Sequence, residues 1–164
     1  PELPGTRIGF EAGVGLEKTG VVGFAGRRAV SMLRVLFREA ARADADTLVR
    51  ACLAQRGVEV FHNSQGVEGL CLLLIAKPGQ DALHAACDEV RRLLPGAQVK
   101  LRENLAALLA LCRTTREVPK LAAAMESAGV PVHHLVQTPP GALFCVNDSQ
   151  YETALRAAYA LAFG

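Results

Sequence analysis

The chain carries an internal repeat. Ten of the 36 residues from Gly57 to Arg92 recur without a gap 72 positions later, so that Gly57-Val58-x-Val60-x-His62 returns as Gly129-Val130-x-Val132-x-His134. The other matched residues are Gln65, Gly69, Ala82, Leu83, Ala85 and Ala86. A repeat of this length is too long for one solenoid unit and is typical of a small domain used twice. The sequence therefore predicts two similar modules, and any function has to belong to the pair.

Length and composition limit what the modules can do. At 164 residues each module buries only a modest core, so we expect the two to pack together or share a sheet. The net charge of +2, with no basic run, gives no indication of a nucleic-acid partner. No secretory signal and no apolar run of about 20 residues is present, which argues against a membrane partner. Five cysteines without a CxxC pair indicate reduced thiols and a cytoplasmic location.

The order of the predicted elements in the first repeat is β-α-β-β-α-β. Asp46 is the expected N-cap of the first helix, and Gly57 ends that helix. Phe61 interrupts the alternation of the strand that follows. The expected strands are 29–37, 58–61, 70–75 and 97–101, and the expected helices are 47–56 and 79–94.

The second repeat follows the same path. Its expected strands are 105–112, 130–136 and 142–146, and its expected helices are 118–127 and 149–162. This order predicts an α+β fold of two ferredoxin-like βαββαβ modules in tandem, with helices on one face of an antiparallel sheet. We expect a pseudo-two-fold axis to relate the modules.

Short motifs along the chain resemble the paired ACT domains of aspartate kinases. Pro4-Gly5-Thr6-Arg7-Ile8 is similar to the motif that ends the catalytic domain in that family. Gly20-Val21-Val22-Gly23-Phe24-Ala25 is similar to the strand that leads into the first ACT domain. Ala128-Gly129-Val130-Pro131-Val132 and the stretch from Cys145 to Phe163 resemble two further family patterns. The motifs occur in the family's order over nearly the whole chain.

The resemblance implies the C-terminal regulatory region of an aspartate kinase. It divides the chain into a segment, residues 1–28, that links to a kinase domain missing here, an ACT domain at 29–101 and a second at 102–164. ATP and Mg²⁺ would then belong to the kinase domain upstream, with no cofactor in this chain. The family also implies inhibition by lysine or threonine and a homodimer or higher oligomer built by pairing ACT sheets. Because the sequence begins at Pro1, we expect it to be part of a longer protein.

Departures from the family pattern leave a second interpretation open. Ala43-Asp44-Ala45-Asp46 has no glycine where the family has a glycine-containing turn, and Phe61 stands where the family often has Asp. Thr138-Pro139-Pro140 replaces a common Ser-Ser-Glu. The alternative is a degenerate ACT pair that acts only in oligomerisation and structural support.

An amino-acid effector needs two recognition groups, which the residue pattern places near the first helix. Backbone N–H groups at a helix N-terminus suit a carboxylate, and an acidic side chain suits an ammonium group. The hypothetical effector site therefore consists of Asp44, Asp46, Thr47, Asn63, Ser64 and Gln65. The simpler interpretation is that Asp46 only caps the helix and that residues 63–65 form a polar strand end.

No catalytic or metal site is predicted. The sequence has no Walker lysine loop and no paired-carboxylate signature. His62, His133 and His134 lack a cysteine or carboxylate at zinc spacing, so we expect strand or interface histidines. Because His62 and His134 occupy equivalent repeat positions, we also consider that they face each other across paired sheets.

Overall fold

The protein is an α+β structure with one antiparallel sheet, seen in a computed structural model that describes residues 20–37, 44–66, 69–77, 79–139 and 141–164. Its strands and helices are β1 (Val21–Phe37), α1 (Ala45–Gln55), β2 (Val58–Gly66), β3 (Gly69–Ala76), α2 (Gln80–Leu93), β4 (Ala97–Cys112), α3 (Val118–Ser127), β5 (His134–Thr138), β6 (Gly141–Asn147) and α4 (Tyr151–Phe163). Short 3-10 turns precede α3 and α4. The predicted fold class, two βαββαβ modules in tandem, is confirmed.

The six strands lie in the order β2-β3-β1-β4-β6-β5. The two central strands are long and run through both modules. The second half of β1 pairs with β3 and with the first half of β4, whereas the second half of β4 pairs with β6. Residues 21–27, which the sequence analysis placed in the linking segment, pair with the second half of β4 and so complete the sheet of the second module.

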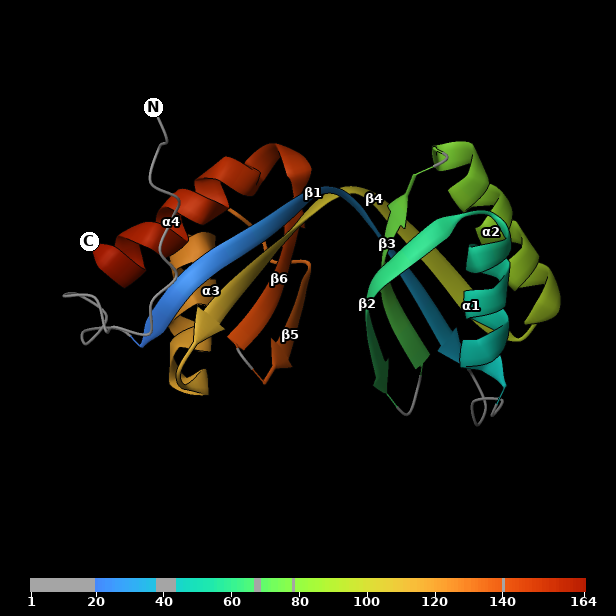
Figure 1. The fold of residues 1–164 in the computed structure, drawn as a ribbon, viewed down its shortest axis with the longest axis horizontal. Coiled ribbons are helices and arrows are strands. Elements are labelled where there is room, and N and C mark those ends of the chain that lie inside the picture. The colour runs from blue at the N-terminus through green and yellow to red at the C-terminus, as the bar shows by residue number, and fades with distance from the viewer. Residues whose placement is uncertain (1–19, 38–43, 67–68, 78, 140) are drawn as a thin grey trace, which may run out of the picture.

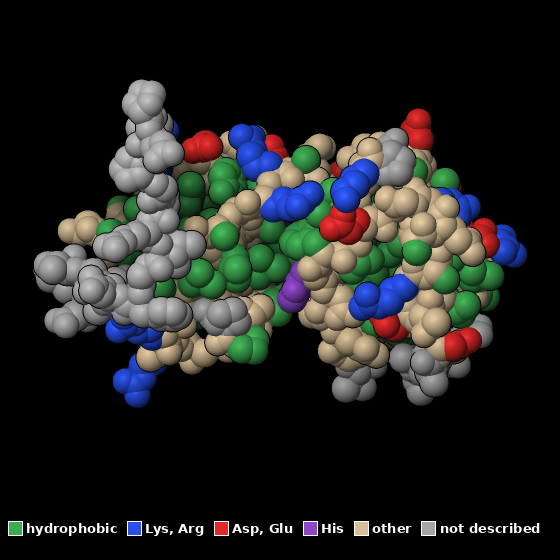
Figure 2. Space-filling model, viewed as in Figure 1, with side chains coloured by type: hydrophobic (Ala, Val, Ile, Leu, Met, Phe, Trp, Pro, Cys, Tyr) green, Lys and Arg blue, Asp and Glu red, His purple; other side chains and the backbone are tan. Residues whose placement is uncertain are grey.

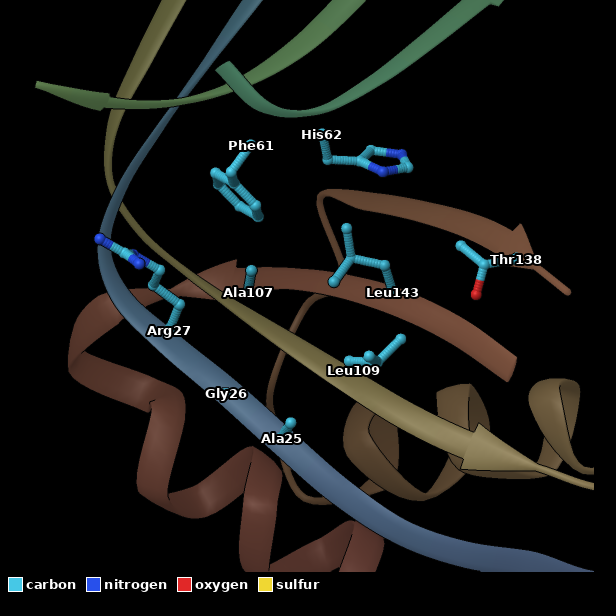
Figure 3. A pocket seen from close by; sticks show the side chains of 9 residues that line it. All are labelled: Ala25, Gly26, Arg27, Phe61, His62, Ala107, Leu109, Thr138 and Leu143. Atoms are coloured by element: carbon cyan, nitrogen blue, oxygen red, sulfur yellow. The ribbon is translucent and has the colours of Figure 1, made fainter. Parts of the chain in front are cut away.

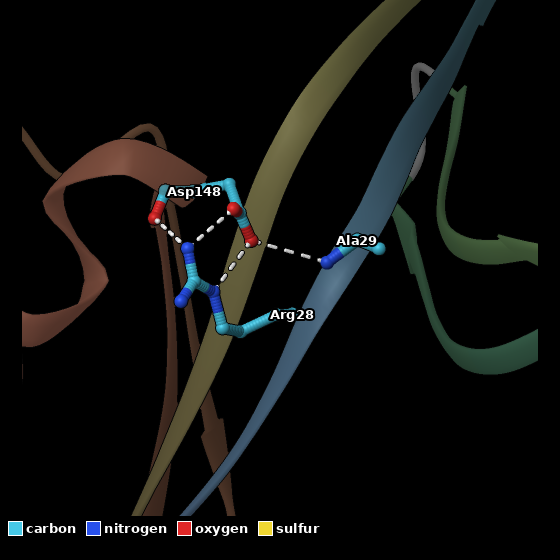
Figure 4. Close-up of polar contacts among 3 residues, drawn as sticks. All are labelled: Arg28, Ala29 and Asp148. Carbon is cyan, nitrogen blue, oxygen red and sulfur yellow. Dashed lines mark hydrogen bonds and ion pairs between the residues drawn. The ribbon is translucent and has the colours of Figure 1, made fainter.

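Both long strands bend near their middle, where the modules meet. Ala29 in β1 and Asn104 in β4 have positive φ angles of 54° and 55°, and the β1–β4 pairing shifts register close to Ala29. The Asp148 carboxylate holds the first bend: it accepts the Ala29 N–H at 3.1 Å and pairs with Arg28 at 2.8 Å (Figure 4). Ala29 and Asn104 lie 75 positions apart, whereas the residues repeated from Gly57 onward lie 72 positions from their counterparts. The first module therefore has three extra residues between its bend and Gly57.

The bends fold the sheet into an arch (Figure 1). α1 and α2 cover the outer face of one half, α3 and α4 cover the outer face of the other, and the helix-free faces turn toward each other. Two large apolar clusters fill the space between each half-sheet and its helices. A third cluster lies between the helix-free faces and consists of Val30, Met32, Leu73, Leu105, Ala107, Leu143 and Cys145. The two modules therefore share a core of their own.

The four helices lie within two residues of their expected bounds, and several local details differ from the sequence analysis. The strand expected at 58–61 continues to Gly66, and the strands expected at 97–101 and 105–112 form the single strand β4. α1 begins at Ala45, which is buried, so that Asp44 and not Asp46 occupies the N-cap position. β5 begins at His134 and not at Val130, because Pro131 has no N–H to donate to a ladder. A register shift in β2 between Val60 and His62 explains the broken alternation at Phe61.

Other expectations fall outside the described residues. These are the motif Pro4-Gly5-Thr6-Arg7-Ile8 and, within expected turns and helix starts, Ala43, Pro78 and Pro140. Within the described part of the chain, no helix is both long enough and apolar enough to cross a membrane.

Candidate functional site at the junction of the two modules

The acidic half of the predicted effector site lies at the start of α1. The side chain of Asp44 makes no capping hydrogen bond to this helix. Asp46, in the first turn, accepts two hydrogen bonds of 3.0 and 2.9 Å from Nε of Arg50, one helical turn further on. Thr47 is exposed. An incoming ammonium group would therefore compete with Arg50 for the Asp46 carboxylate.

The polar half of the predicted site divides between the two faces of β2. Asn63 and Gln65 pair with Leu72 and Leu70, which belong to the core beneath α1 and α2. Ser64 pairs with Cys71 and so faces the opposite way, into the junction between the modules. The first turn of α1 and the end of β2 lie at the same end of the sheet (Figure 1). Asp46 bonds to Arg50 within its own helix and not to the end of β2.

A cavity of about 640 Å³ lies at the junction beside Ser64, and we call it the polar cavity because Arg34, Gln65 and His134 contribute to its lining together with apolar residues. It is lined by Arg34, Leu36, Ser64, Gln65, Gly66, Gly69, Leu70, Cys71 and His134. Of the six predicted site residues, Ser64 and Gln65 line this cavity; Asp44, Asp46, Thr47 and Asn63 do not.

The modules contact each other across this polar cavity. Arg34 of β1 donates a hydrogen bond to the His133 carbonyl at 3.1 Å, and Ser64 Oγ lies 3.5 Å from His134 Nε2. Burial lowers the pKa of His134, and electrostatic repulsion by Arg34 and, less strongly, by His62 lowers it further. That His62 and His134 face each other stays a prediction from the sequence repeat.

A second, largely apolar cavity of about 370 Å³ lies between the same helix-free faces. Its lining residues are Ala25, Gly26, Arg27, Phe61, His62, Ala107, Leu109, Thr138 and Leu143. Phe61 and His62 reach down from β2 toward Ala107, Leu109 and Leu143, which come from the other module (Figure 3). On the surface, hydrophobic side chains run across one half of the molecule toward the junction, where a histidine is visible (Figure 2).

Sequence reasoning missed most of the residues that line the two cavities. Arg34, Leu109 and Leu143 belong to strands that were expected, but their juxtaposition depends on the bends at Ala29 and Asn104. One signal in the sequence pointed to these cavities: histidine occurs at the equivalent repeat positions 62 and 134. A polar side chain that is kept in both repeats indicates a shared interface.

The described residues offer no group of three His, Cys, Asp or Glu side chains that could hold a metal ion. The thiols are poor nucleophiles as well. Burial raises the pKa of Cys87 to about 11 and that of Cys145 to about 12, which keeps both thiols protonated at neutral pH.

Comparison with known proteins identifies the fold. Neither the protein-family models nor the curated proteins gave a match. Among solved structures, the chain is similar to Clostridium acetobutylicum aspartate kinase, with a TM-score of 0.76 and 16% identity over 88% of this chain and 34% of that one. The ligand-free regulatory subunit of Thermus thermophilus aspartate kinase matches with a TM-score of 0.66 and 23% identity, over 88% of this chain and 99% of that one.

A third similar structure is E. coli aspartokinase III in complex with lysine and aspartate, with a TM-score of 0.66 and 15% identity over 88% of this chain. The chain spans about a third of the length of both the Clostridium and the E. coli kinase, 34% in each case, but nearly all of the Thermus regulatory subunit. The resemblance to aspartate kinase regulatory regions that the motifs indicated is thus confirmed at the level of the fold.

Proposed function

We propose that the chain is the regulatory, end-product-sensing region of an aspartate kinase, and that it binds lysine or threonine. The observation that carries the proposal is the shared fold. The chain matches 99% of a solved aspartate kinase regulatory subunit, and it also matches part of an aspartokinase solved in complex with lysine. The phosphoryl transfer, with its ATP and Mg²⁺, takes place in a kinase domain outside this chain. The region would act in the cytoplasm, in lysine, threonine and methionine biosynthesis.

The effector site that we propose lies where the start of α1 meets the end of β2. First-turn N–H groups of α1 carry partial positive charge and suit the effector's carboxylate. Asp44 and Asp46 supply negative charge for an ammonium group, Thr47 lies beside them, and Asn63, Ser64 and Gln65 supply hydrogen-bonding groups from β2. Of the β2 side chains, Asn63 and Gln65 lie on the helix-covered face and are best placed to take part.

A titration tests this assignment. Isothermal calorimetry with lysine and with threonine should give saturable binding by the parent chain. The double variant Asp44→Ala/Gln65→Ala should weaken that binding by roughly 1–3 kcal/mol, because a charged partner and a hydrogen-bonding group are both removed. The matched control is Gln80→Ala/Asp81→Ala, which makes the same two changes at the start of α2 and should leave the affinity unchanged.

Each other outcome has a definite meaning. Unchanged affinity in the Asp44→Ala/Gln65→Ala variant would move the site away from the start of α1. If the parent chain binds neither amino acid, the ligand-sensing function is wrong, and an ACT pair with a purely structural role in assembly takes its place.

A further inference from the structure

Two positively charged side chains lie next to each other on the helix-free face of the first half-sheet. Arg34 of β1 is the direct cross-strand partner of Cys71 in β3 on one side and of Lys100 in β4 on the other. Cross-strand partners project from the same face, and like charges directly opposite each other destabilise a sheet. Because Cys71 packs against the shared core between the modules, this face is the one that turns toward the junction.

The described residues supply no acidic group to offset these two cations. None of the ion pairs between described residues involves Arg34 or Lys100. In the described part of the chain, the lining of either cavity includes neither Asp nor Glu. Lys100 is exposed, but Arg34 is half-buried. A charge withdrawn from water without a counter-charge is costly, so the junction favours an anion at Arg34.

The polar cavity gives such an anion room beside Arg34. Gly66 and Gly69 are paired with each other where β2 and β3 meet, and their missing side chains leave the space open. The volume of about 640 Å³ is within the usual range for small-molecule sites. Leu36, the cross-strand partner of Gly69, is an apolar side chain beside this space.

The donors of the lining suit a carboxylate. The guanidinium of Arg34 has five N–H groups, and the His133 carbonyl accepts a hydrogen bond from Nη2 alone. Two parallel N–H groups of an arginine match the two oxygens of a carboxylate. Ser64 Oγ, which lies 3.5 Å from His134 Nε2, adds a hydroxyl donor on the same face of the sheet.

The charge of the lining limits the kind of anion. Burial lowers the pKa of His134 and raises that of the Cys71 thiol, so both groups are uncharged at neutral pH. Arg34 is then the one ionised side chain among the described lining residues, which matches a single negative charge. An amino acid fits poorly, because its ammonium group would lie near Arg34 without an acidic side chain in that lining to receive it.

We propose that the polar cavity binds a small monocarboxylate with an apolar body and no ammonium group. Its carboxylate binds Arg34 and Ser64, and its body lies over Gly66 and Gly69 against Leu36. Lys100 attracts the anion from the neighbouring strand. The ligand joins the two modules, because His134 of β5 lines the same cavity. This inference goes beyond the proposed effector function, since neither α1 nor an acidic side chain takes part.

The test compares three compounds that share a carbon skeleton: isocaproate, its uncharged amide, and leucine, which is isocaproate with an added ammonium group. In isotope-labelled protein observed by NMR, isocaproate should shift the Leu36 methyl and Gly69 amide signals in a saturable way. The methyl signal of Leu109, in the apolar cavity, should stay unchanged. The amide and leucine should each bind about tenfold more weakly, because one lacks the charge and the other adds a repelled ammonium group.

Variants separate the contributions of charge and space. Arg34→Gln keeps a donor for the His133 carbonyl and should weaken isocaproate about tenfold, while leaving the amide unchanged. Lys100→Gln should weaken isocaproate about twofold, because its charge acts through solvent. Gly66→Val should abolish binding by filling the cavity, and an added Cβ there meets no atom within 4 Å. Arg156→Gln, which removes an exposed arginine from α4, is the matched control and should change nothing.

Thermal unfolding checks that each variant is folded. If Arg34→Gln does not fold, Ser64→Ala takes its place; it removes one hydroxyl and should weaken isocaproate about threefold. The proposal is overturned if isocaproate shifts neither Leu36 nor Gly69, or if the amide or leucine binds as tightly as isocaproate. Equal effects of Arg34→Gln and Arg156→Gln would overturn it as well. Lysine or threonine binding at α1 is a separate measurement, so failure of one proposal leaves the other standing.

Discussion

At the scale of single residues, Asp148 is the polar side chain on which the bend in β1 depends most. It accepts hydrogen bonds from the Ala29 N–H and from Arg28, and the bond from Arg28 holds the pKa of its carboxyl below the ordinary value of 3.8. The mirror position in β4 carries an acidic residue, Glu103, next to Asn104, and its carboxylate lies 3.0 Å from Nε2 of His84 in α2. Each bend is thus flanked by a polar pair that ties it to a neighbouring element.

We predict that Asp148→Ala lowers the midpoint of thermal unfolding by about 2–4 °C, as expected when one hydrogen-bonded group is lost from a chain of this size. Because the folded pKa of Asp148 is lowered, its contribution is present above about pH 4 and is lost as the pH falls through the folded value. The difference between parent and variant should therefore shrink between about pH 5 and 2. Asp88→Ala, which removes an exposed helical ion pair, should change the midpoint little.

The sequence could nominate residue types for binding but not their surroundings. Asp44, Asp46 and Thr47 follow from the rule that a helix start attracts anions and acids. Arg50 binds Asp46 because the start of α1 places the two residues one helical turn apart. Ser64 and Gln65 face opposite ways because of the register in which β2 pairs with β3. Arg34, on a mostly apolar strand, gave no signal at all, because only the folded arch brings it to His133.

At the scale of elements, the repeated glycine is explained by the close approach of neighbouring strands. Gly69 begins β3 and Gly141 begins β6. A Cβ atom on Gly69 would overlap the carbonyl oxygen of Val35, and one on Gly141 would overlap that of Ala110. Gly141 also has a φ angle of +156°, which side-chain-bearing residues rarely adopt.

Gly141→Ala should accordingly lower the free energy of unfolding by on the order of 3 kcal/mol, because the strand start must move or distort. Gly69→Ala should act in the same direction. Gly23→Ala is the matched change within β1, where an added Cβ meets no atom within 4 Å, and it should have only a small effect. Equal losses at positions 23 and 141, measured by denaturant unfolding, would contradict the steric explanation.

The elements themselves were largely readable from the sequence, and the limits of that reading have physical causes. Apolar periodicity and glycine stops located all four helices, since these signals are local. Residues 21–27 were indicated as a strand only by the family motif, since glycines interrupt their apolar pattern. Their partner lies 80 or more residues away, in the second half of β4, so the local pattern could not place the strand in the second module.

At the scale of the whole molecule, the repeat predicts two modules and their pseudo-two-fold relation, but not the shared strands. Because β1 and β4 each serve both modules, the half-sheet of the second module is complete only with residues 21–27, which precede the first module in the sequence. The junction is therefore part of the fold, and the shared strands hold the two half-sheets on either side of the cavities in place.

The arrangement leaves β2 and β5 as the two edges of the sheet. Unpaired edge groups favour pairing with another chain, so we predict a homodimer or higher oligomer at tens of micromolar protein, with the mass measured by light scattering. Leu135 on β5 is 40% exposed, and Leu135→Glu should shift the mass toward the monomer because it adds charge to the edge. Leu161→Glu on α4, where the side chain is 37% exposed, is the matched control and should leave the mass unchanged. A monomeric parent, or dissociation caused by Leu161→Glu and not by Leu135→Glu, would show that the sheet edge is not the contact.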